Sequence, residues 1–60
     1  MRKYRFPNNE SLAAFRAFVQ ERGVGFVTYP GNVLHVWGLP ADKELDFADE
    51  ARKHGGSIGD

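Results

Sequence analysis

One stretch of the chain, residues 24–37, reads VGFVTYPGNVLHVW. Its two halves are rich in β-branched and aromatic residues, which are typical of strands. Between the halves, Pro30, Gly31 and Asn32 have the chemistry of a turn. The stretch therefore predicts a β-hairpin that supplies two neighbouring strands of an antiparallel sheet.

The length of the hairpin loop determines which side chains share a face of the sheet. A three-residue loop gives one face with Val24, Phe26, Leu34 and Val36, and another with Val27, Tyr29, Val33, His35 and Trp37. A two-residue loop gives one face with Val24, Phe26, Thr28, Val33, His35 and Trp37, and another with Val27, Tyr29, Leu34 and Val36. Both faces are apolar in either register, and the pattern alone leaves the two registers open.

Helical periodicity occurs on both sides of the hairpin. The first helix is expected to start at a cap on Asn8 or Asn9 and to end at Arg22, before Gly23, and its apolar residues are Leu12, Phe15, Phe18 and Val19. The second is expected to start near Pro40, with Pro40 in the first turn or Asp42 as the cap, and to stop at Gly55. Its apolar arc holds Leu45, Phe47, Ala48 and Ala51, and its outer face is mostly acidic.

A short strand is predicted at the start of the chain, where apolar and basic residues alternate up to Pro7. Tyr4 and Phe6 fall on one face of this strand, and Lys3 and Arg5 on the other. Residues 57–60 remain as a tail or as the stub of a last strand.

These elements predict a single small α+β domain over residues 1–60, in the order βαββα with a possible truncated last strand. Both helices are expected on one face of an antiparallel sheet. This topology resembles the ferredoxin-like split βαβ sandwich, which small-ligand regulatory domains and RNA-recognition modules share. The resemblance is one of topology, because 33–37 and 4–6 do not match the aromatic RNA-contact motifs of recognition modules.

Charge and composition restrict the function classes. The formal net charge is zero, with eight basic and eight acidic residues, which argues against a general binder of polyanions. Cysteine is absent, so disulfides and thiolate metal sites are excluded. The longest apolar stretch, 12–19, is interrupted by Arg16 and is far shorter than the ~20 residues of a membrane span. We expect a soluble, cytoplasmic protein that has no membrane partner.

Catalytic and metal-binding patterns are weak. None of Ser11, Thr28 and Ser57 is predicted on a strained turn beside a base, although Thr28 and His35 become cross-strand neighbours in one hairpin register. Asp46, Glu50 and His54 follow one another at helical spacing, a pattern that can hold a divalent ion weakly but is typical of a solvated helix face. We therefore expect no enzymatic activity, no metal and no cofactor.

We expect one apolar face of the sheet to stay exposed, because two helices can cover only one side of a small sheet. Exposed apolar faces usually mark interaction sites. With a three-residue loop, that face carries Tyr29, His35 and Trp37 near Lys3 and Arg5. We interpret it as the surface of a protein-binding regulatory, adaptor or inhibitor module, or of a homodimer. The alternative is a module that binds single-stranded nucleic acid or a nucleotide on the same face. A third possibility is that Trp37 lies under the helices as ordinary core.

Overall fold

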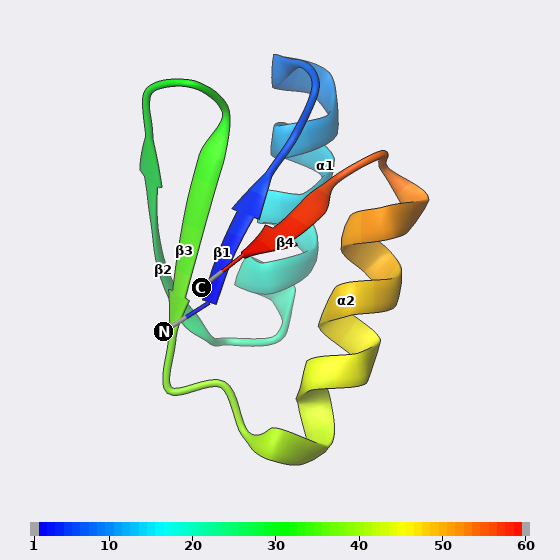
Figure 1. Cartoon of the computed structure of the whole chain (residues 1–60). Coiled ribbons are helices and arrows are strands. Elements are labelled where there is room, and N and C mark those ends of the chain that lie inside the picture. Colours follow the sequence, from blue (N-terminus) through cyan, green and yellow to red (C-terminus); the bar gives the residue numbers. More distant parts are fainter. Residues whose placement is uncertain (1, 60) are drawn as a thin grey trace.

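The computed structural model describes residues 2–59, which form one four-stranded antiparallel sheet and two α-helices (Figure 1). In chain order the elements are β1 (Arg2–Arg5), α1 (Asn9–Glu21), β2 (Gly25–Tyr29), β3 (Val33–Trp37), the 3₁₀ turn η1 (Ala41–Lys43), α2 (Glu44–Lys53) and β4 (Ser57–Gly59). The order of strands in the sheet is β2-β3-β1-β4. The predicted small α+β class is confirmed, and the proposed strand stub is a paired strand over residues 57–59, while residue 60 lies outside the described part.

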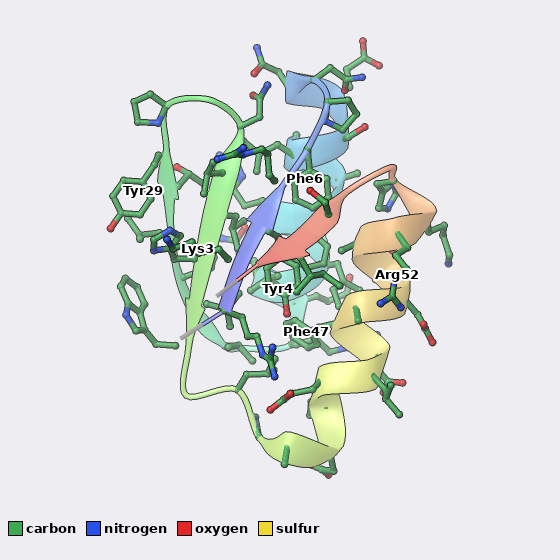
Figure 2. The ribbon with its side chains drawn as sticks, viewed as in Figure 1. Lys3, Tyr4, Phe6, Tyr29, Phe47 and Arg52 are labelled. Atoms are coloured by element: carbon green, nitrogen blue, oxygen red, sulfur yellow. The ribbon has the colours of Figure 1, made fainter. Side chains whose placement is uncertain are left out.

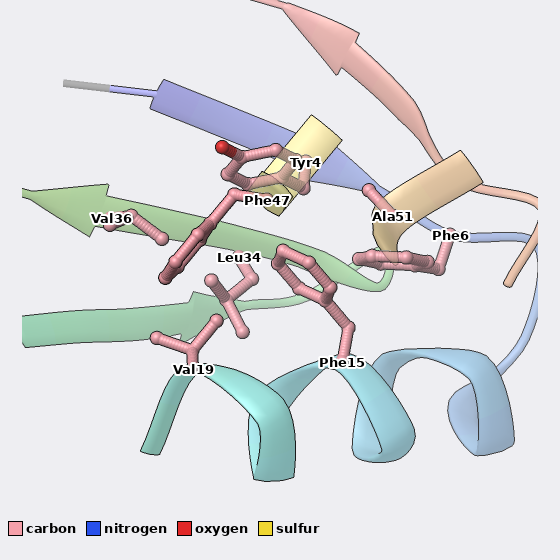
Figure 3. Close-up of a cluster of buried hydrophobic side chains, with 8 residues drawn as sticks. All are labelled: Tyr4, Phe6, Phe15, Val19, Leu34, Val36, Phe47 and Ala51. Atoms are coloured by element: carbon pink, nitrogen blue, oxygen red, sulfur yellow. The ribbon is translucent and has the colours of Figure 1, made fainter. Parts of the chain in front are cut away.

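Both helices pack on the same face of the sheet, as predicted (Figure 1). Between them and the sheet lies a core of eight buried side chains: Tyr4, Phe6, Phe15, Val19, Leu34, Val36, Phe47 and Ala51 (Figure 3). Phe15 is central, with its ring centroid 4.8 Å from that of Tyr4, 5.1 Å from Phe6 and 6.2 Å from Phe47. The helices and the sheet therefore bury their apolar sides against each other, and only one face of the sheet is covered by helices.

The hairpin has the three-residue loop. Tyr29 lies opposite Val33, Val27 opposite His35 and Gly25 opposite Trp37. The loop accommodates this register because Gly31 and Asn32 adopt φ values of 90° and 60°, a left-handed region that glycine and asparagine tolerate. The two-residue loop is wrong, and with it the grouping of Thr28 with His35 on one face.

The ends of α1 agree with the sequence. Asn8 is the N-cap and its side chain accepts a hydrogen bond from the Ser11 amide at 2.8 Å. After the helix, Gly23 has a φ of +73°, and its amide donates to the Gln20 carbonyl at 3.1 Å. Asn9, the alternative cap, is the first residue of the helix.

The second helix differs from the prediction at its start and on one side. Asp42 is not a cap: it lies within η1, where the Lys43 amide donates to the Pro40 carbonyl, and α2 begins at Glu44 without a side-chain cap. Leu45 is 75% exposed and does not belong to the core arc. It lines a shallow hollow together with Tyr4, Ala48 and Ile58.

Candidate interaction surface

The side of the sheet that faces away from the helices carries all five residues singled out from the sequence. We call this side the open face. The register places Lys3 beside His35 and His35 beside Val27, and it places Arg5 beside Val33 and Val33 beside Tyr29. In Figure 2, Tyr29 lies on the side of the hairpin away from the helices, whereas Tyr4 and Phe47 lie between the sheet and α2. Trp37 is 46% exposed, so the possibility that it lies under the helices is wrong.

The aromatic side chains of the open face are held in place by their neighbours. The rings of Tyr29 and His35 pack together, with their centroids 4.5 Å apart and their planes tilted by 54°. Trp37 lies across from Gly25, and a Cβ atom at Gly25 would be in ordinary van der Waals contact with Cε3 of the indole, at 3.9 Å. The indole therefore lies against the backbone of β2 at Gly25, and about half of its surface faces solvent.

Two basic residues run along β1 beside the aromatic strip. Lys3 and Arg5 are exposed, and within residues 2–59 neither takes part in an ion pair. The described strands contain no acidic residue, so no carboxylate of the sheet offsets these charges on the open face. Together with Val33, Ser57, Ile58 and Gly59 they border a shallow hollow of about 290 Å³. The open face thus combines apolar and aromatic area with positive charge.

His35 occupies the middle of this surface and carries an unusual feature. Its Nδ1 atom is buried and, in the part of the chain that the structure describes, has no hydrogen-bond partner. A buried polar atom without a partner lowers the stability of a fold. An apolar ring of similar size at position 35 is therefore expected to give a more stable sheet than histidine.

The histidine and carboxylates of α2 form a different kind of cluster. Glu50 accepts from Lys53 and contacts His54, each at 3.3 Å. Burial raises the pKa of Glu50, but the hydrogen bonds from Lys53 and His54 outweigh it and hold that pKa below its ordinary value. No group of three potential metal ligands occurs among the described residues 2–59, and the contacts of Glu50 are those of a helix surface.

Catalytic side chains are not brought together by the hairpin. Thr28 lies opposite Leu34 and shares the helix-covered side of the sheet, whereas His35 lies on the open face. The Thr28–His35 pair considered from the sequence is therefore not formed.

The role of Gly25 was missed from the sequence, as was the ion pair between Arg2 and Glu44. A glycine inside a strand signals a close approach of another group, and a three-residue loop places Gly25 opposite Trp37. The Arg2–Glu44 pair joins β1 to the start of α2, and no local pattern indicates a contact between residues so distant in the chain.

Comparison with protein families, with curated proteins and with solved structures gives no match for this chain. None of the helices within residues 2–59 has the length and apolar character needed to span a bilayer. The function is therefore inferred from the open face itself.

Proposed function

We propose that this protein is a non-enzymatic binding module, of the regulatory, adaptor or inhibitor kind, that holds a protein partner on its open face. The observation that carries the proposal is the exposure of Trp37 and Tyr29, 46% and 45%, on a sheet face that no described element covers. Exposed aromatic residues grouped on one surface are typical of recognition sites.

The contacts within the open face support a protein partner with an acidic margin. Trp37 and Tyr29 are exposed to nearly the same fraction, but Tyr29 also packs on His35, so Trp37 serves as the anchor. Lys3 and Arg5 lie one strand away on β1, where carboxylates of a partner can reach them. An aromatic anchor surrounded by a polar rim is the usual anatomy of a protein interface.

A second candidate is single-stranded nucleic acid or a nucleotide, and a specific observation favours it. In the described residues 2–59, Lys3 and Arg5 have no ion-pair partner; Lys3 lies beside His35 and Arg5 beside Val33, on the face that carries the exposed indole, and the described strands carry no acid to repel phosphates. The strand order β2-β3-β1-β4 supports a ferredoxin-like sandwich, an architecture compatible with either function. Zero net charge over the chain makes the protein partner our first proposal.

The test compares Trp37→Ala with Leu45→Ala in capture from cell lysate, with and without nuclease. Leu45 is the matched control because it is an exposed apolar residue on α2. We expect the wild-type protein and Leu45→Ala to retain a protein partner after nuclease treatment, and Trp37→Ala to lose it. Capture that Trp37→Ala leaves unchanged would contradict the proposal.

A fluorescence titration separates the two candidates. Trp37 is the only tryptophan of the chain, so its emission reports directly on this face. Stacking of a short single-stranded oligonucleotide would quench the indole, and added salt would weaken the effect. Salt-sensitive quenching would favour the nucleic-acid candidate, and an unchanged emission spectrum would favour the protein partner.

A further inference from the structure

The two edges of the sheet differ in how well they are protected. β4 is three residues long, whereas β2 forms the other edge with five residues, Gly25–Tyr29, that include no charge and no proline. An edge strand presents unpaired backbone groups, and proteins usually protect such edges with charges, proline, bulges or short strands. β2 has none of the charged or proline residues that would prevent another strand from pairing with it.

We propose that β2 pairs antiparallel with β2 of a second copy of this chain, across a two-fold axis at Val27. Antiparallel pairing follows from two-fold symmetry, in which identical strands meet in opposite directions. A centre at Val27 is the register that pairs all five residues of the strand, because Val27 is its middle residue. Shifting the centre by one residue leaves two residues at one end of each strand without a partner in the other strand.

Side-chain sizes on the open face fit this register. It places Tyr29 of each copy beside Gly25 of the other, so the bulkiest residue of the strand meets the smallest. Trp37 already lies on the β3 side of Gly25. Tyr29 of the second copy then occupies the side of the glycine that is free in one copy, and the glycine becomes a seat between two aromatic rings.

The helix-covered side of the same edge offers an independent fit. In the proposed register Phe26 of one copy lies opposite Thr28 of the other. Thr28 borders a hollow of about 260 Å³ between β2 and α1, whose other lining residues are Asn9, Leu12, Ala13 and Arg16. Phe26 is only half-buried in one copy, so its ring has apolar surface left to place against Leu12 and Ala13 of the second copy.

Pairing of this kind joins two open faces into one surface. A two-fold axis between antiparallel edge strands stands perpendicular to the sheet, so both open faces point the same way. The chain has zero formal net charge, and β2 itself has no charged side chain that would repel the same strand of a second copy.

Single-cysteine variants test the register, since the natural chain has no cysteine. In Val27→Cys the two thiols face each other across the axis, where directly opposed Cβ atoms lie about 4.5–5.5 Å apart and a disulfide needs only a small adjustment. Thr28→Cys, on the other side of the same strand, and Ser57→Cys, on the β4 edge, are the matched controls. Under mild oxidation we expect a covalent dimer of Val27→Cys to form at least about tenfold faster than that of either control.

Sedimentation of the wild-type chain and of Val27→Lys completes the test without an engineered thiol. We expect a concentration-dependent dimer for the wild-type chain and a folded monomer for Val27→Lys, because a charge at the centre of the edge opposes pairing. Equal cross-linking at Thr28, a wild-type protein that stays monomeric up to near-millimolar concentration, or a Val27→Lys dimer of undiminished strength would overturn the proposal.

Discussion

The two faces of one small sheet have different compositions although the same strands build both. On β3, Leu34 and Val36 are buried under the helices, while His35 and Trp37 alternate with them on the open face. On β1, Tyr4 is 1% exposed, and Lys3 and Arg5 flank it on the other side. The covered face is mainly apolar, with Thr28 and the Arg2–Glu44 ion pair at its margins, and the open face combines apolar and basic groups with a buried nitrogen that has no partner within residues 2–59. The first has the composition of a hydrophobic core, and the second has the composition expected of the binding surface that we propose.

Phe15→Ala is the strongest test of the covered face. The ring contacts Tyr4, Phe6 and Phe47, so its removal leaves a cavity at the centre of the core. We expect the free energy of unfolding to fall by about 3–5 kcal/mol, enough to unfold a domain of this size. Circular dichroism during denaturant titration measures it. A variant that retains cooperative unfolding near the wild-type midpoint would contradict the packing described.

Gly56→Ala tests the packing of the covered face where Gly56 lies against Phe6. An added Cβ would lie 2.5 Å from Cε1 of Phe6 and 2.9 Å from the Ala51 carbonyl oxygen, closer than atoms can approach. We expect a loss of about 1–3 kcal/mol, as for other overpacked sites. Gly59→Ala is the control, because nothing lies within 4 Å of its added Cβ. Equal thermal stability of the two variants would contradict the tight packing of Gly56 on Phe6.

Tyr4 makes the covered face sensitive to alkali. Burial raises the pKa of its hydroxyl above the ordinary value of 10.0, while Arg2 lowers it and Glu44 raises it. The raised pKa means that the folded state favours the neutral phenol. This contribution to stability is fully present below about pH 10 and is lost as the pH rises through the folded-state pKa. Thermal unfolding of wild type and Tyr4→Phe across this range measures it, and identical pH profiles would contradict the assignment.

His35→Phe tests whether the histidine on the open face lowers the free energy of unfolding. Phenylalanine keeps a ring beside Tyr29 and removes the buried Nδ1 that has no partner among the described residues. We therefore expect the free energy of unfolding to rise by about 1 kcal/mol. Denaturant titration measures the change, and a destabilised variant would indicate that Nδ1 is satisfied in solution.

Trp37→Ala is expected to have the smallest effect on stability. Its side chain is half exposed and rests on Gly25, so we expect a loss below about 1 kcal/mol. An aqueous quencher should also reach the indole in the wild-type protein. A protected indole, or a loss of several kcal/mol, would remove the distinction between the two faces at this position.

The alternation within each strand could be predicted from the sequence, because side chains point to opposite faces with a period of two. The clearest case is the first strand, where the sequence predicts Tyr4 and Phe6 on one face and Lys3 and Arg5 on the other. The structure confirms this alternation. The hairpin register could not be decided in advance. Pro30, Gly31 and Asn32 are turn residues that suit a loop of either length. The register depends on the left-handed conformation that Asn32 adopts in the fold.

Contacts between distant elements account for most of what the sequence did not reveal. The start of α2 at Glu44 follows the 3₁₀ turn η1, and Leu45 is exposed beside the hollow that Ile58 of β4 also lines. That Nδ1 of His35 has no partner within residues 2–59 depends on what surrounds the ring in three dimensions. The five residues proposed as a site were grouped from their strand periodicity, and the register places them on one face, while their role stays a prediction.

The position of β1 inside the sheet has a consequence for how the chain folds. β1 lies between β3 and β4, so residues 2–5 pair with strands from the middle of the chain and from residues 57–59. Half of the sheet cannot be completed until both distant segments reach β1, and such long-range pairing slows folding. The pairing of β1 with β3 and β4 also joins the segment β1-α1-β2 to the segment β3-α2-β4 in one cooperative unit. We therefore do not expect the β2–β3 hairpin to stay folded by itself once β1 detaches.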